Sequence, residues 1–250
     1  MLVFITGATS GIGKSTAEIF AKHGYDIIIT GRRQERLTEL KRQLETAYTV
    51  KVTSLCFDIR HSGEVEAAIQ SLSSENRKID VLVNNAGLAA GLSSIQDGEL
   101  SHWERMIDTN IKGLLYTTKA VSNLMIKNGK GHIVNIGSVA GKEVYANGNV
   151  YCATKHAVDA LNKGMRIDLL QHNIKVTAVN PGMVETEFSV VRFDGDADRA
   201  KKVYLGMEPL KPEDIAETIF WVASRPSHVN INDILIMPTM QASATNVIRK

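Results

Sequence analysis

Residues 2–13 read L-V-F-I-T-G-A-T-S-G-I-G, and residues 14–22 continue as K-S-T-A-E-I-F-A-K. The short apolar run at the start predicts a buried strand, and the spacing of apolar residues after Gly13 predicts an amphipathic helix. Gly7, Gly11 and Gly13 therefore lie at a strand-to-helix turn, where glycine lets the backbone bend tightly and approach a phosphate. The amides at the start of the helix would face that anion.

The same alternation of short apolar runs and amphipathic stretches continues to the end of the chain. Strands are predicted at residues 2–5, 26–30, 51–57, 81–83, 132–136, 175–179 and 233–237. Helices are predicted at residues 14–22, 34–45, 63–73, 101–127, 150–171 and 212–224. This order predicts an α/β fold with a Rossmann-type, doubly wound, parallel seven-stranded sheet and helices on both faces. No repeat or linker interrupts it, so residues 1–250 are expected to form a single domain.

Residues 183–211 break this rhythm, because they are rich in charge and glycine and lack clear periodicity. Loops of this length in compact domains are commonly lids or binding segments, so we expect a substrate lid here. Asp194, Asp196 and Asp198 lack the closing glutamate of a calcium loop, and the histidines show no ligand spacing. No metal site is predicted.

Composition sets the broad class of the protein. Apolar residues make up 44 % and charged residues 22 %, and the net charge is +2 with no long run of either sign. A soluble globular protein with a small-molecule substrate is expected, rather than a partner of nucleic acid or of a membrane. The apolar strand at Leu2 leaves no room for a signal peptide. Cys56 and Cys152 read as reduced thiols, so a cytoplasmic protein is predicted.

The second predicted strand ends in Thr30-Gly-Arg-Arg33. Dinucleotide sites that select NAD usually place a carboxylate here for the ribose 2′-hydroxyl, whereas NADP sites place arginine near the 2′-phosphate. Arg32 and Arg33 can form charge-assisted hydrogen bonds with a phosphate, and no carboxylate ends this strand, since Asp26 begins it. NADP(H) is the predicted cofactor.

Tyr151 and Lys155 are four residues apart and would share one face of a helix. A free tyrosine titrates near pH ~10 and exchanges protons poorly at neutral pH. A positive charge at about 4 Å in a partly buried site is worth roughly 4 kcal/mol, enough to lower a pKa by about two to three units. We therefore expect Lys155 to lower the pKa of Tyr151.

Further motifs stand in a fixed order along the chain: T-G-x-x-x-G-x-G at residues 6–13, N-N-A-G at residues 84–87, Asn110, Ser138, Y-x-x-x-K at residues 151–155 and Pro181-Gly182. With them the chain resembles the short-chain dehydrogenase/reductase family over essentially its whole length. The resemblance implies that Tyr151 is the general acid/base and that Ser138 holds the substrate oxygen. It also implies that Lys155 binds the nicotinamide ribose and that Asn110 helps to keep a water against Lys155.

The resemblance also implies a nucleotide site, in which Asp58 contacts the adenine, Asn85 to Gly87 border the adenosine ribose and Thr186 meets the nicotinamide carboxamide. The full implied set is Gly7, Thr9, Ser10, Gly11, Ile12, Gly13, Arg32, Arg33, Asp58, Ile59, Asn85, Ala86, Gly87, Tyr151, Lys155, Pro181, Gly182, Val184 and Thr186. Family members are commonly tetramers, so a homotetramer is expected.

Residues 31–36, 108–113, 187–195 and 229–233 resemble one subgroup, the NADP-dependent 3-hydroxy acid dehydrogenases. That subgroup acts on serine, allo-threonine and small β-hydroxy acids such as 3-hydroxypropionate. Arg192 is the candidate for binding a substrate carboxylate, because a planar guanidinium can hold one bidentately. One alternative is a carbonyl reductase for 3-oxoacyl thioesters or bulkier ketones, many of which have V-D-G-G where this chain has Met237-Pro. Another is a non-catalytic NADP(H)-sensing protein.

Overall fold

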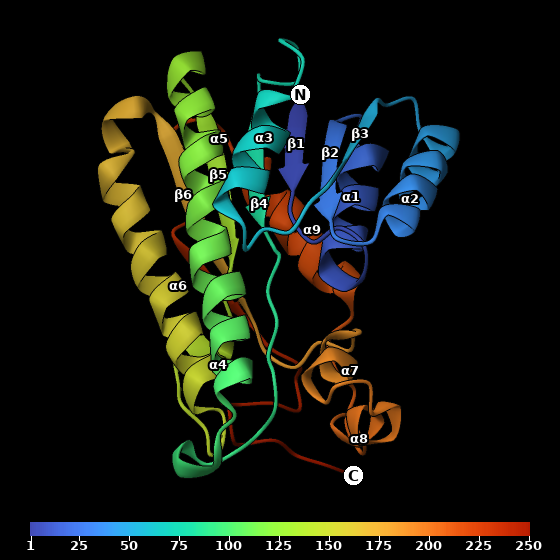
Figure 1. Ribbon diagram of the computed structural model, residues 1–250, viewed down its shortest axis with the longest axis vertical. Helices are drawn as coiled ribbons and strands as arrows, with labels where there is room; N and C mark the ends of the chain where they lie inside the picture. Colours follow the sequence, from blue (N-terminus) through green and yellow to red (C-terminus); the bar gives the residue numbers. More distant parts are fainter.

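The computed structural model covers residues 1–250 and contains one sheet of seven parallel strands (Figure 1). The strands are β1 (Leu2–Ile5), β2 (Asp26–Gly31), β3 (Val52–Cys56), β4 (Val81–Asn84), β5 (Gly131–Ile136), β6 (Ile174–Pro181) and β7 (Asp233–Ile236). They lie in the order β3-β2-β1-β4-β5-β6-β7, which confirms the predicted fold class. Strand order reverses between β1 and β4, and ligands of such sheets bind beyond the carboxyl ends of the strands at that point.

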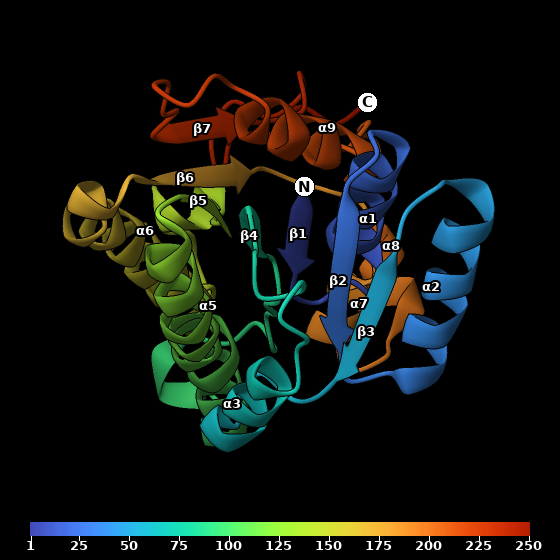
Figure 2. The same cartoon turned by 90° about the horizontal axis from the view of Figure 1, so that it is seen from above.

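Alternate residues of each strand face opposite sides of the sheet, and both sides are buried at the central strands β1 and β4, whereas the edge strand β7 is partly exposed. Leu2 and Phe4 belong to one apolar core, and Val3 and Ile5 to the other. Helices α3 (Ser62–Gln70), α5 (Leu114–Asn128) and α6 (Asn149–Asp168) cover the first side, and helices α1 (Gly11–Lys22), α2 (Gln34–Ala47) and α9 (Pro212–Ala223) cover the second (Figure 2). Burial on both sides explains why the central strands β1 and β4 are almost wholly apolar. No helix combines the length and apolar character needed to cross a membrane.

The single helix predicted at residues 101–127 is divided in the structure. It begins, after the short turn η1 (Ile95–Asp97), as α4 (Leu100–Ile107), widens into the π-helical stretch η2 (Asp108–Gly113), and continues as α5. Such a widening inserts one residue into the helical turn and often lies at a functional site. The helix predicted to reach residue 171 ends at Asp168 and is followed by the 3₁₀ turn η4 (Leu170–His172).

The lid, residues 183–211, contains two short helices, α7 (Phe188–Arg192) and α8 (Ala197–Lys202). Five and six residues are too few to produce the periodicity by which the sequence could have predicted them. Both helices lie beyond the carboxyl ends of the strands, close to the C-terminus (Figure 1). The chain end holds the lid there, because the Lys250 amide donates to the Gly206 carbonyl at 2.8 Å.

Candidate active site

The turn between β1 and α1 has the conformation that its glycines allow. Gly7 and Gly11 have φ values of 66° and 51°, in the left-handed region that favours glycine. A Cβ on Gly13 would overlap the Gly7 carbonyl, so only glycine fits there. Asn85, which follows β4, donates from Nδ2 to the carbonyls of Thr6 and Gly7 at 2.9 and 3.1 Å. The side chain of Asn85, just after β4, therefore fixes the conformation of the turn that follows β1.

The two arginines after β2 differ in their surroundings. Arg33 lies across the turn, where its Nη2 donates to Thr9 Oγ1 at 2.7 Å and to Ser10 Oγ at 2.9 Å. The side chain of Arg32 is 57 % exposed, and its Nη1 lies 3.7 Å from Asp58 Oδ2. Both guanidinium groups thus lie beside the turn, where a phosphate could meet them.

Two charged partners at this edge were not predicted from the sequence. Arg60 binds Asp58 Oδ2 through Nε and Nη2 at 3.0 and 2.6 Å. Burial raises the pKa of the Asp58 carboxyl, but these hydrogen bonds outweigh burial and hold the pKa below its usual value. Glu187 of the lid lies 2.9 Å from Arg33 Nη1 and 2.6 Å from Arg36 Nη1. No local pattern predicts the contact between Glu187 and Arg33, because the two residues are 154 positions apart.

Three polar side chains meet beyond the end of β5. Ser138 precedes the 3₁₀ turn η3 (Val139–Gly141). Tyr151 and Lys155 lie one turn apart on α6 and are only 8 % and 7 % exposed. Lys155 Nζ donates to the carbonyl of Ile136, the last residue of β5, at 2.9 Å. Strand β5 and helix α6 therefore bring three of the four predicted catalytic residues together, and the fourth is Asn110.

Burial dominates the proton affinities of these groups. It raises the pKa of Tyr151 above its ordinary value, and neighbouring Tyr145 adds to that increase. The Ser138 hydroxyl and the charge of Arg192 oppose it. Burial also lowers the pKa of Lys155 to about 8. The expected lowering of the Tyr151 pKa is therefore wrong here, because desolvation acts on the phenol while the ammonium is directed at a backbone carbonyl.

Asn110 lies in η2 and is 2 % exposed. Its Oδ1 accepts a hydrogen bond from the Leu88 amide at 2.8 Å, and its Nδ2 donates to the Leu88 carbonyl at 2.8 Å and to Thr154 Oγ1 at 3.0 Å. A Cβ on Gly87 would lie 3.3 Å from Asn110 Oδ1 and 3.7 Å from Lys155 Nζ, so both side chains lie beside this glycine. Because its side-chain amide is committed to protein groups, a water-holding role would fall to the main chain of Asn110.

Arg192, the last residue of α7, approaches the catalytic groups from the lid. Its carbonyl accepts a hydrogen bond from the Gly91 amide at 2.9 Å, and its Nε donates to the Gly91 carbonyl at 3.2 Å. The guanidinium carbon lies 5.6 Å from the ring centroids of both Tyr145 and Tyr151. Its Nη2 is buried and has no hydrogen-bond partner. A buried cationic donor without a partner is costly, so this position suits an anionic ligand.

A cavity of about 520 Å³ joins the turn, the arginine edge and the catalytic groups. The predicted residues that line it are Gly7, Thr9, Ser10, Gly11, Ile12, Arg32, Arg33, Asp58, Ile59, Asn85, Ala86, Gly87, Ser138, Tyr151, Lys155, Pro181, Gly182, Val184, Thr186 and Arg192. Gly13 and Asn110 do not line it. Tyr145 and Phe188 also line the cavity; no motif in the sequence pointed to Tyr145, and Phe188 was noted only as part of the stretch 187–195.

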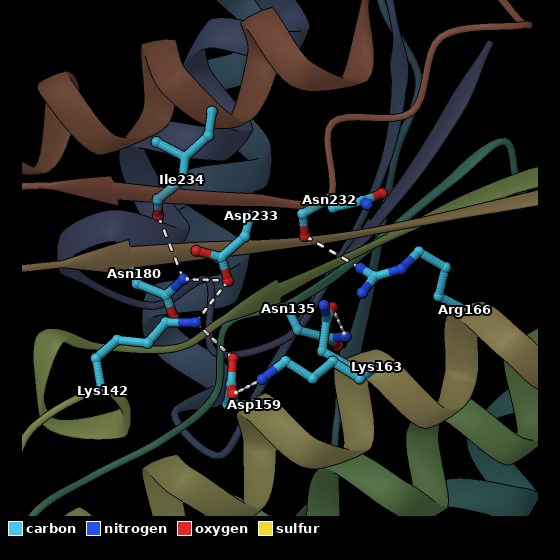
Figure 3. Close-up of polar contacts among 10 residues, drawn as sticks. Asn135, Lys142, Asp159, Lys163, Arg166, Asn180, Asn232, Asp233 and Ile234 are labelled. Atoms are coloured by element: carbon cyan, nitrogen blue, oxygen red, sulfur yellow. Dashed lines mark hydrogen bonds and ion pairs between the residues drawn. The ribbon is translucent and has the colours of Figure 1, made fainter.

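A charged network supports the end of β5 and the turn η3 (Figure 3). Lys142 donates from Nζ to Asp159 on α6 at 2.6 Å and to Asp233 on β7 at 2.7 Å. Asn180 on β6 donates from Nδ2 to the same Asp233 oxygen at 3.1 Å. A Cβ on Gly137, just after β5, would overlap Asn180 Oδ1, so a larger residue there would force the Asn180 side chain to move. The network connects the turn η3, which follows Ser138, to α6 and to the strands β6 and β7.

The chain contains no group of three or more His, Cys, Asp or Glu side chains placed to hold a metal ion. The aspartates of the lid have other contacts. Asp194 Oδ1 lies 3.0 Å from Arg105 Nη2 on α4, and Asp196 Oδ1 accepts a hydrogen bond from the Arg199 amide at the start of α8. These contacts position the lid.

Known proteins resemble the chain in sequence and in structure. Residues 1–196 match the family model described as short chain dehydrogenase. Over 246 residues the chain is 47 % identical to NADP-dependent 3-hydroxy acid dehydrogenase YdfG of Salmonella typhi, covering 98 % of this chain and 97 % of that protein. Over 242 residues it is 46 % identical to sulfoacetaldehyde reductase 2 of Chromohalobacter salexigens, covering 96 % and 95 %.

Among solved structures, the closed form of serine dehydrogenase complexed with NADP+ superposes with a TM-score of 0.93. That structure is 46 % identical in sequence, and the match covers 100 % of both chains. The match therefore includes the lid and the C-terminal residues as well as the sheet.

Proposed function

The chain belongs to the short-chain dehydrogenase family, and from this membership we propose that it is an NADP-dependent oxidoreductase of small 3-hydroxy acids. Serine, allo-threonine and 3-hydroxypropionate are the proposed substrates. One observation carries the choice of an acid. The buried Nη2 of Arg192 lacks a partner, and its guanidinium lies beside Tyr151 in the cavity that Ser138 also lines.

The residues at the nucleotide end of the cavity fit NADP(H). Gly7 and Gly11 give the left-handed turn that allows close approach of a pyrophosphate, and Gly13 keeps the turn tight. Arg32 and Arg33 lie at the edge where a 2′-phosphate needs cations. When bound, the nicotinamide supplies or accepts the hydride, and the protein provides orientation and proton transfer. The NADP dependence of the relatives supports this assignment.

The protein's own part of the reaction is a proton transfer at Tyr151 Oη. Because burial raises its pKa, Tyr151 keeps its proton at neutral pH and can donate it to a substrate carbonyl oxygen. Ser138 Oγ holds the same oxygen by a hydrogen bond and stabilises the charge that develops on it. In oxidation Tyr151 Oη takes up the hydroxyl proton, and the Ser138 hydroxyl and the charge of Arg192 favour the ionised phenol.

Arg192 would bind the substrate carboxylate through its unpartnered Nη2. In a 3-hydroxy acid one carbon separates the carboxyl group from the hydroxyl-bearing carbon, so a carboxylate anchored at Arg192 fixes how far the hydroxyl lies from Tyr151. The rings of Tyr145 and Tyr151 hold the guanidinium plane in place. A small substrate would then be held at its carboxylate by Arg192 and at its hydroxyl by Tyr151. Holding both ends orients the substrate, and such orientation can supply a large part of the rate increase.

A carbonyl reductase for 3-oxoacyl thioesters or bulkier ketones is the alternative enzyme. Gln241 and Ala244, near the C-terminus, line the cavity together with the cation of Arg192, and this lining suits a short anion better. Sulfoacetaldehyde deserves a test, because the same guanidinium could bind its sulfonate and a relative is named for it. A non-catalytic NADP(H)-sensing protein is less favoured, because Ser138, Tyr151 and Lys155 all line one cavity.

A substrate panel tests this proposal. We expect NADP+ reduction with L-serine, allo-threonine and 3-hydroxypropionate, and little NADPH oxidation with an acetoacetyl thioester. Arg192→Met should raise KM for 3-hydroxypropionate about 100-fold, because a buried charge pair is lost, and should change KM for neutral 1-propanol by less than about twofold. Arg199→Met is the matched control, since Arg199 is an exposed lid arginine stacked on Phe193. An equal effect of Arg192→Met on both substrates would remove Arg192 from this role.

We further propose that the protein is a cytoplasmic homotetramer. Its two cysteines are free thiols, as a reducing compartment favours. Exposed apolar side chains lie on two separate faces, with Leu115 and Ile167 on α5 and α6, and Trp221 and Leu235 on α9 and β7 (Figure 2). Two different two-fold interfaces generate a tetramer. Native mass spectrometry should give a four-chain particle, and a monomer at micromolar concentration would contradict this.

A further inference from the structure

Glu187 joins the lid to the nucleotide end of the cavity. It precedes α7, and its Oε2 and Oε1 lie 2.9 Å from Arg33 Nη1 and 2.6 Å from Arg36 Nη1. Burial raises the pKa of the Glu187 carboxyl, but hydrogen bonds from the two arginines outweigh burial and lower the pKa. The carboxylate is therefore ionised at neutral pH, and a full negative charge lies among the cations of the nucleotide site.

Every nitrogen of the Arg33 guanidinium is already bound to the protein. Nε and Nη2 donate to Thr9 Oγ1 at 3.1 and 2.7 Å, Nη2 also donates to Ser10 Oγ at 2.9 Å, and Nη1 donates to Glu187 at 2.9 Å. These bonds use four of the five N–H groups of the guanidinium, so a phosphate can form a bidentate pair with Arg33 only by taking a donor from another acceptor. Among these acceptors Glu187 alone is charged, so it is the strongest competitor.

Arg32 lies at the same edge, but it is more exposed and its contacts with the protein are weaker. Its side chain is 57 % exposed, and its one ionic contact, with Asp58, is 3.7 Å long. Asp58 is itself neutralised by Arg60 at 2.6 Å. A phosphate can thus bind Arg32 without displacing a strong partner, whereas binding to Arg33 and Arg36 requires competition with the lid.

We propose that Glu187 competes with the ribose 2′-phosphate for Arg33 and Arg36 and thereby limits how tightly the phosphorylated nucleotide is held. This inference rests on the NADP assignment made above. A carboxylate in this position keeps the affinity of the protein for the phosphorylated nucleotide moderate. Moderate affinity suits a cofactor that must leave after each turnover. Since Glu187 belongs to the lid, the competition also links the nucleotide edge to the helix that ends in Arg192.

Calorimetric titration with adenosine 2′,5′-bisphosphate and with 5′-AMP tests the proposal, because neither fragment contains a nicotinamide and no turnover occurs. Glu187→Gln keeps the shape of the side chain and removes its charge. We expect the variant to bind the bisphosphate about 3- to 10-fold more tightly and 5′-AMP within about twofold of wild type. The gain should shrink between ~50 and ~500 mM salt, because the contacts are partly exposed ion pairs.

Two further variants sharpen this test. Glu187→Asp keeps the charge and should remain closer to wild type than Glu187→Gln. Glu185→Gln removes an exposed carboxylate two residues earlier that forms no ion pair, and it should match wild type with both fragments. An unchanged or weaker affinity of Glu187→Gln for the bisphosphate, at unchanged melting temperature, would overturn the proposal. Wild-type protein that binds both fragments equally would instead contradict the NADP assignment itself.

Discussion

At the scale of single residues, the chemistry of the site depends on how Tyr151 and Lys155 are shielded from water. Their spacing in the sequence is enough to place them on one face of a helix, but not to give their degree of burial. In the structure both are almost completely buried, and burial moves the two pKa values in opposite directions, upward for the phenol and downward for the ammonium. The phenol is thus protonated at neutral pH, which is the form that reduction requires.

This arrangement predicts different pH profiles for the two directions of reaction. Reduction uses protonated Tyr151, whose pKa is raised by burial, so its kcat should stay flat across neutral pH. Oxidation requires ionised Tyr151, whose pKa is raised, so its kcat should still be rising with pH at about pH 8. Steady-state rates measured from ~pH 6 to ~pH 10 in both directions provide the check. An oxidation rate that is already maximal at neutral pH would show that the pKa of Tyr151 is lowered.

At the scale of elements, the short helix α7 connects the two ends of the cavity. Glu187 precedes it and binds the arginines near the nucleotide turn, Phe188 packs edge-on against Tyr151 at 5.6 Å, and Arg192 ends it above the same ring. The sequence allowed a lid to be expected from length and composition. It did not reveal α7, because a helix of five residues has too few turns for a periodic signal.

The ion pairs of Lys142 lead to a prediction about the stability of the protein. Lys142→Met removes the contacts that tie the turn η3 to α6 and β7, and we expect it to lower the free energy of unfolding by about 1–2 kcal/mol, or the melting temperature by ~2–8 °C. Lys163→Met is the matched control, since Lys163 contacts the same Asp159 but is 59 % exposed. It should cost less than about 0.5 kcal/mol. Equal losses in thermal unfolding would contradict a bracing role for Lys142.

At the scale of the whole molecule, the parallel sheet explains why the motifs converge. Thr6, Arg32, Asn85, Ser138 and Gly182 each lie at or just beyond the carboxyl end of a strand. Because all seven strands point the same way, these ends meet at one edge. The order of strands and helices was predictable from apolar runs, and so was the convergence of these residues.

Contacts between distant segments could not be predicted in the same way. Glu187 with Arg33, and Arg192 with Gly91, join segments separated by 154 and 101 residues through loops whose path no periodicity determines. The π-helical widening at Asn110 was missed for a related reason, since a single inserted residue hardly alters the apolar pattern of a long helix. Of these features, only the Arg192 contact lies at the substrate end of the cavity, and the Glu187 contact lies at its nucleotide end.

The central claim is that the chain transfers a proton at Tyr151 Oη during NADP-dependent oxidation of a small hydroxy acid. Tyr151→Phe tests it most directly, because the ring that packs against Phe188 and Arg192 is kept and one hydroxyl is removed. Turnover of 3-hydroxypropionate should fall at least ~1,000-fold, while the Kd for NADPH, measured by fluorescence titration, should stay within about threefold of wild type. Turnover within about tenfold of wild type, with NADPH still bound, would contradict the claim.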